Sequence, residues 1–226
     1  MRYAICFFPA VGVLCGAALW LWAVLAQATG MSGVLFAAIA ACLPILVTGG
    51  IHMDGYLDMV DALSSHQTRE KKLAIMKDAN CGAFAVIRLC SYFAAYFALC
   101  GCVQFTLRVG ALWALALVGE RALSGLAVAA FPLAKNTGLA HTFATAADRQ
   151  TVRRFLCGAS ALLVLALTVL GGGALAAAAL LAMSRYYFVA KTQFGGITGD
   201  LAGWFLQKAE LWMLAALAAC QWGGLL

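Results

Sequence analysis

Long apolar stretches alternate with short polar segments along the whole chain. An α-helix needs roughly twenty mostly apolar residues to cross a hydrocarbon core about 30 Å thick. Seven stretches approach that length, near positions 5–27, 33–51, 82–102, 109–131, 155–171, 174–190 and 208–226. The pattern predicts an all-α polytopic transmembrane bundle of about seven spans, with the two termini on opposite sides of the membrane.

Composition supports a membrane protein. Of the 226 residues, 65% are hydrophobic and 11% are charged, whereas soluble domains carry about 25% charged residues. Most of the surface is therefore expected to face lipid. The net charge of +6 is modest and falls in loops, which argues against nucleic-acid binding. The nine cysteines form no CxxC pair and lie mostly in apolar stretches, as expected for small packing residues in a reduced compartment.

Basic residues orient the predicted bundle. They gather in three polar segments, 52–81, 132–154 and 191–207. With seven spans, these segments and the N-terminus fall on one side, and the segments on the other side hold a single basic residue, Arg108. By the positive-inside rule the basic side is cytoplasmic. The sequence thus predicts one integral membrane domain over residues 1–226 with three cytoplasmic loops.

The main candidate chemistry is a group of carboxylates at the end of the second span. Three of only nine acidic residues fall within eight positions, as Asp54, Asp58 and Asp61. Their spacing places them on one face of a helix, where like charges repel. The ordinary alternative is a solvated helix face, which the apolar residues between them disfavour. We expect an interfacial helix whose carboxylates bind Mg²⁺, a cation that takes oxygen ligands and shares them with substrate phosphates.

Residues just before these carboxylates add to the candidate site. Gly50 allows a tight turn and the close approach of a substrate phosphate. His52 is a candidate base or phosphate donor, although a lone histidine is as often a structural hydrogen-bonding residue.

Two further polar segments fit phosphate chemistry. Lys77 and Asp78 precede the third span, where a cation suits phosphate and a carboxylate suits a metal or a nucleophile. A helix cap with its flank is the alternative. The later glycine-rich segment offers backbone N–H groups at Thr198 and Gly199 to phosphate, and Asp200 to a metal. Alone, that segment also fits a plain turn.

Charged residues also occur inside the predicted spans, among them Arg88, Glu120, Arg121 and Arg185. Each costs at least about 2.5–3.5 kcal/mol in the membrane and needs a partner or a wet cavity. Arg88 and Arg185 lie near the cytoplasmic edge, within reach of phosphate. Glu120 and Arg121 lie deeper, and Arg121 is left open between an interhelical ion pair and a ligand contact.

Several of these segments resemble the cobalamin synthase family, the adenosylcobinamide-GDP ribazoletransferases. The family's GGxHxDGxxDxxDG segment is matched by GGIHMDGYLDMVDAL, its IMKDSxxGAFG stretch by IMKDANCGAF, and its GGxTGDxxGA stretch by GGITGDLAG. Arg121 and the loop from Lys135 to Leu139 resemble its R…ARPxGLG segment. The departures are Ala62 and Ala85 in place of glycine, and Asn136-Thr137 in the last loop; none removes a carboxylate.

The resemblance implies a phosphoryl-linked transfer. The hydroxyl of α-ribazole, or of its 5′-phosphate, attacks adenosylcobinamide-GDP at the phosphorus that bears the cobinamide, and GMP leaves. Mg²⁺ would be held by the three clustered carboxylates with Asp200, while Lys77 and Lys135 meet phosphate and Asp78 orients the nucleophile. It also implies the inner membrane of a prokaryote, a site facing the cytoplasm, and a homo-oligomer or other cobalamin-assembly proteins as partners.

Two other classes remain as alternatives. Membrane phosphotransferases acting on CDP-linked alcohols also place aspartates on helix ends, but their DGxxAR pattern is absent after Asp54-Gly55. A divalent-cation transporter would carry acidic or histidine residues near the midplane of several helices, whereas only Glu120 lies deep in the predicted bundle.

Overall fold

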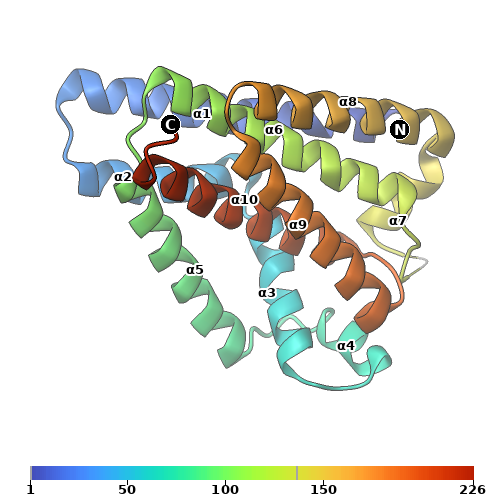
Figure 1. Cartoon of the computed structure of the whole chain (residues 1–226). Coiled ribbons are helices and arrows are strands. Elements are labelled where there is room, and N and C mark those ends of the chain that lie inside the picture. Colours follow the sequence, from blue (N-terminus) through green and yellow to red (C-terminus); the bar gives the residue numbers. More distant parts are fainter. Residues whose placement is uncertain (1, 136) are drawn as a thin grey trace.

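The structure, a computed structural model, describes residues 2–135 and 137–226, apart from the side chain of Leu139. Asn136, expected in the substrate loop, lies outside the described residues. The described part of the chain forms ten α-helices and no β-strand (Figure 1). Their bounds are α1 Phe8–Thr29, α2 Gly33–Thr48, α3 Ile51–Ser64, α4 Arg69–Ile75, α5 Ala83–Cys102, α6 Leu107–Ala130, α7 Leu139–Ala146, α8 Arg149–Val169, α9 Gly173–Val189 and α10 Gly199–Trp222. A short 3-10 helix, η1 Ala4–Phe7, precedes α1, and a π-helical turn, η2 Ala190–Phe194, follows α9.

Among the described residues, five helical segments are long and apolar enough to cross a membrane: η1 with α1, α5, α6, α8, and α9 with η2. A sixth membrane span results only if α2 and α3 are counted together as one broken span. The bend between the axes of these two helices is 96°. The all-α membrane bundle is confirmed, while the count of seven spans is not shown. The helix α3 does not continue the direction of α2, because Gly49 and Gly50 between them adopt left-handed backbone angles.

Two predicted boundaries are wrong for identifiable reasons. The helix α8 begins at Arg149 rather than near 155, because the Asp148 carboxylate accepts the Thr151 N–H and caps its first turn. The segment 191–207, expected as a loop, is helical from Gly199 onward, because the Thr198 hydroxyl accepts the Leu201 N–H. The α10 helix therefore begins beside the candidate site.

The bundle is layered around α6 and α10. Helices α1 and α8 pack on α6, while α3 and α9 pack on α10. Figure 1 shows α1, α6 and α8 running side by side, with α3 and α4 projecting away from them. The crossing of α3 and α10 is tight: a Cβ atom added to Gly55 would lie 2.8 Å from Cα of Asp200, and one on Gly203 would lie 2.7 Å from the His52 carbonyl oxygen. Glycine at both positions thus lets the two backbones meet.

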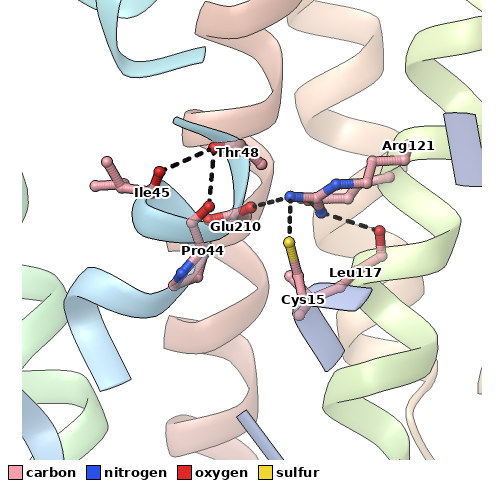
Figure 2. A network of polar contacts seen from close by, with 8 residues as sticks. Cys15, Pro44, Ile45, Thr48, Leu117, Arg121 and Glu210 are labelled. Atoms are coloured by element: carbon pink, nitrogen blue, oxygen red, sulfur yellow. Dashed lines mark hydrogen bonds and ion pairs between the residues drawn. The ribbon is translucent and has the colours of Figure 1, made fainter. Parts of the chain in front are cut away.

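A buried ion network joins the central helices. Arg121 of α6 donates to the Glu210 carboxylate of α10 at 3.1 Å and is also paired with Glu120. Figure 2 shows its guanidinium between Glu210 and Cys15 of α1, with the Leu117 carbonyl as a further acceptor. Of the two alternatives left open for Arg121, the structure has the interhelical ion pair.

Candidate active site

A cavity of about 920 Å³ lies at the end of the bundle where α1 and α3 begin and α6 ends. The loop after α6 and the start of α10 close its other sides. All these segments lie at the end of the bundle that carries the basic loops. This cavity is large enough for a sizeable organic ligand.

One part of the cavity wall is polar. It gathers seven of the predicted site residues: His52, Asp54, Lys77, Lys135, Thr198, Gly199 and Asp200. They come from three polar segments that lie far apart in the sequence. The structure thus brings residues of these three segments to the wall of one cavity.

The rest of the wall is largely apolar. Its side chains come from η1, α1, α6, α7 and α10, and include Ile5, Phe8, Val11, Val128, Phe143 and Leu206. A cavity lined by both charged groups and hydrocarbon fits an amphipathic ligand with an anionic group.

Contact between two loops brings Lys135 to this site. The segment after α6 pairs with the segment before α10 through a parallel bridge between Leu133 and Ile197. The Ala134 N–H donates to the Ile197 carbonyl at 2.9 Å, and the Ile197 N–H donates to the Pro132 carbonyl at 2.8 Å. Sequence reasoning missed this pairing, because nothing local in either segment indicates its partner.

Asp58 lies one helical turn beyond Asp54 on the same face of α3, outside the cavity wall. Partial burial raises the pKa of Asp58 to about 6, and the negative charges of Asp54, Asp200 and Asp61 act in the same direction. Lys135 opposes this effect. The carboxylates of α3 and α10 thus concentrate negative charge at one place, with the lysine beside them.

Asp61 has a structural partner that the sequence did not reveal. Its carboxylate accepts the Gly82 N–H at 2.6 Å and the Ala85 N–H at 3.0 Å. These groups open α5, so Asp61 of α3 caps another helix. Both of its oxygen atoms are engaged in this cap.

Asp78 is held in its own turn. Its carboxylate accepts the backbone N–H of Asn80 at 3.0 Å and the side-chain amide at 2.8 Å. The hydrogen bond from the Asn80 backbone lowers the pKa of Asp78. The residue does not line the cavity, and neither do Gly50, Arg88 and Arg121. Gly50 instead supplies the turn into α3, with φ at 79°.

The carboxylates do not form a ready-made metal cage. Across residues 2–135 and 137–226, no group of three or more His, Cys, Asp or Glu side chains is placed to hold a metal ion. Asp54 and Asp200 nonetheless line one cavity, and Asp58 lies close to both. The protein could offer such an ion one or two carboxylates, with the remaining ligands coming from a substrate.

Comparison with known proteins decides the family. The family model described as cobalamin-5-phosphate synthase matches residues 1–218. The chain belongs to this family. The resemblance carried by the polar segments is confirmed, and with it the assignment to a family of transferases.

Individual relatives agree along nearly their full lengths. An adenosylcobinamide-GDP ribazoletransferase of Lachnoclostridium phytofermentans is 43% identical over 228 residues, covering 96% of this chain and 83% of the relative. Proteins of the same name from Pseudomonas putida and Desulfitobacterium hafniense are 35% and 32% identical, covering 96% and 92% of this chain and 87% and 83% of theirs. No solved structure matches the chain.

Proposed function

We propose that this chain joins adenosylcobinamide-GDP to α-ribazole, or to its 5′-phosphate, and releases GMP. Family membership supports the reaction class, and the relatives' name specifies the two substrates. The observation that carries the proposal is the cavity, because charged residues and a large number of apolar residues line it together. A corrinoid linked to a nucleoside diphosphate likewise combines a bulky amphipathic body with an anionic group.

The basic and polar residues of the cavity bind the diphosphate. Lys77 and Lys135 place positive charge where negative charge develops as the bond to GMP breaks. The N–H groups at the start of α10, beginning at Gly199, point toward an anion as helix N-termini do. His52 lines the same cavity and is the candidate base for an incoming hydroxyl.

Mg²⁺ is the cofactor that the carboxylates fit. Asp54 and Asp200, with Asp58 beside them, would hold it, and it would neutralise the diphosphate and polarise the reacting phosphorus. Mg²⁺ commonly uses one or two carboxylates together with substrate phosphates. An incomplete protein site is therefore the arrangement expected for this ion. Asp61 and Asp78 are left out of the proposed site, because the carboxylate of each already accepts hydrogen bonds within the chain.

The proposed topology has the site facing the cytoplasm of a bacterium. Seven spans result if α2 and α10 also cross the membrane. The 24 residues of α10 extend roughly 36 Å, and its Asp200 and Glu210 face the cavity and the buried network rather than lipid. The carboxylate-bearing α3 then lies at the interface, on the side of the basic loops.

Release of GMP tests the proposal. Membranes containing the protein are expected to release GMP from adenosylcobinamide-GDP and α-ribazole with Mg²⁺, and to stop when EDTA is added. Asp200→Asn is expected to lower the rate at least about 100-fold, since it removes a group that stabilises the transition state through the metal. Asp148→Asn is the matched control, because Asp148 caps α8 and does not line the cavity.

Other products would refute the assignment. Release of CMP from a CDP-alcohol would indicate a lipid phosphotransferase, and ion flux into sealed vesicles without an organic product would indicate a transporter. Equal GMP release by Asp200→Asn and wild type would remove the metal argument.

A further inference from the structure

Three basic residues gather on a face of the molecule that the substrate cavity does not reach. Arg88 lies on α5, Arg185 on α9 and Lys208 on α10. None of them lines the cavity. Lys208 follows the cavity residue Leu206 by two positions, which places it about 160° away around α10. The three side chains therefore belong to a different surface, here called the basic face.

The cations of the basic face lie against aromatic rings and close enough to act on one another electrostatically. The Lys208 ammonium lies 5.8 Å from the ring centre of Tyr56, and the Arg185 guanidinium lies 6.0 Å from that of Trp204. The positive charges of Arg88 and Arg185 both act on Lys208. Helices α5 and α9 each pack against α10, which is why residues so distant in the sequence meet.

The three cations lack a counter-ion. Within the described ranges, every ion pair with a carboxylate is made by Arg2 or Arg121, so none involves the basic face. The surrounding helix surfaces are exposed and apolar, with Phe84 and Ile87 on α5 and Leu181 and Phe188 on α9. Like charges next to hydrocarbon are costly unless an anion neutralises them. An anion is therefore expected among them.

The place of the basic face in the bundle indicates which anion this is. Arg88 is near the start of α5, Arg185 is near the end of α9, and Lys208 is in the first half of α10. These helix ends adjoin the basic loops, where the anionic headgroups of the cytoplasmic leaflet lie. Basic pockets between transmembrane helices on that side bind such headgroups.

We propose that Arg88, Arg185 and Lys208 bind the phosphate headgroup of an anionic phospholipid at a site separate from the substrate cavity. The acyl chains lie along the exposed apolar surfaces of α5 and α9. The site goes beyond the transferase reaction and does not depend on its substrates.

Native mass spectrometry of the detergent-purified protein tests this site by counting bound lipids during titration. Wild type is expected to bind a first phosphatidylglycerol at least about tenfold more tightly than phosphatidylcholine, because each basic residue near a headgroup strengthens binding about fivefold. The triple variant Arg88→Gln, Arg185→Gln, Lys208→Gln is expected to lose this preference. A matched triple variant changes Arg149, Arg153 and Arg154 to Gln and so removes the same charge from exposed positions of α8. This variant is expected to keep the preference for phosphatidylglycerol.

Several outcomes would overturn the proposal. One is that the basic-face variant still prefers phosphatidylglycerol to phosphatidylcholine as strongly as wild type does. The others are that the α8 variant loses this preference equally, or that wild type shows no such preference. Displacement of phosphatidylglycerol by millimolar inorganic phosphate would assign the face to a soluble phosphate instead. If the triple variant does not elute as a single species, Arg88→Gln alone decides, since Arg88 is exposed: about fivefold weaker binding supports the site, and unchanged binding refutes it.

Discussion

Carboxylates occur in two contrasting settings in this molecule. Glu120 and Glu210 are buried between helices and share one arginine, Arg121, as their partner. Asp54 and Asp200 line an open cavity, and no arginine pairs with either of them in the described residues. The chain thus supplies an arginine where the carboxylates are purely internal and none where they line the cavity, which is the contrast that the proposed Mg²⁺ site requires.

The two settings are mechanically connected. The helix α10 carries Asp200 in its first turn and Glu210 ten residues later, so the buried pair fixes the position of the helix that carries the cavity carboxylate. The close approach at Gly55 and Gly203 then sets α3 against the same helix. The buried network thus holds the helix whose first turn lines the cavity.

Breaking the buried network is expected to have the largest effect on stability. Arg121→Met leaves two carboxylates buried without a cation, which costs about 3–5 kcal/mol in comparable cases. For a chain of this length the thermal midpoint should fall by roughly 6–20 °C. Thermal unfolding in detergent measures this change.

Further substitutions test whether the charge imbalance causes that loss. Glu120→Gln keeps the Arg121–Glu210 pair and should cost much less than Arg121→Met. Combining Arg121→Met with Glu120→Gln and Glu210→Gln should recover most of the stability, because no buried charge is then left alone. A triple variant as unstable as Arg121→Met would show that packing, rather than charge, dominates at this position.

The sequence predicts the features that depend on local patterns and misses those that depend on contacts between distant segments. Apolar length indicated α5, α6 and α9 closely, and the spacing of Asp54 and Asp58 indicated that both lie on one face of a helix, since both patterns are local. The pairing of Leu133 with Ile197 depends on backbone contacts between segments over sixty positions apart, which no local pattern contains. The same holds for the cap that Asp61 provides to α5.

Asp61 permits a sharper test of the comparison, because the sequence grouped it with the cavity carboxylates while the structure gives it a helix to cap. Asp61→Ala is expected to lower the free energy of unfolding by about 1 kcal/mol, the usual cost of a lost cap. The rate of GMP release per folded molecule should change little. Asp61→Asn retains an acceptor oxygen and should recover part of the stability. A large loss of rate in Asp61→Asn, with stability intact, would return Asp61 to the metal site.

The smallest expected effect concerns Asp58, whose substitution should raise the stability of the protein where the substitutions above lower it. Because partial burial and the carboxylates of Asp54, Asp200 and Asp61 raise the pKa of Asp58 from 3.8 to about 6, its ionised form disfavours the folded state. Without metal, this penalty is absent below about pH 4, grows as the pH rises through about 6, and is complete above it. Asp58→Asn removes the penalty, so it should stabilise the protein at pH 7.5 in EDTA by about 0.5 kcal/mol, the size of a like-charge pair one turn apart.

The corresponding shift in thermal midpoint is roughly 1–2 °C at pH 7.5 and close to zero at pH 4. Asp148→Asn is the control with the opposite sign. The Thr151 N–H and the Arg2 side chain hold the pKa of Asp148 below its usual value, so its ionised form stabilises the fold and its loss should destabilise the protein at pH 7.5. If Asp58→Asn behaved like Asp148→Asn, the α3 carboxylates would already be neutralised within the chain, and the contrast between the cavity and the buried network would not hold.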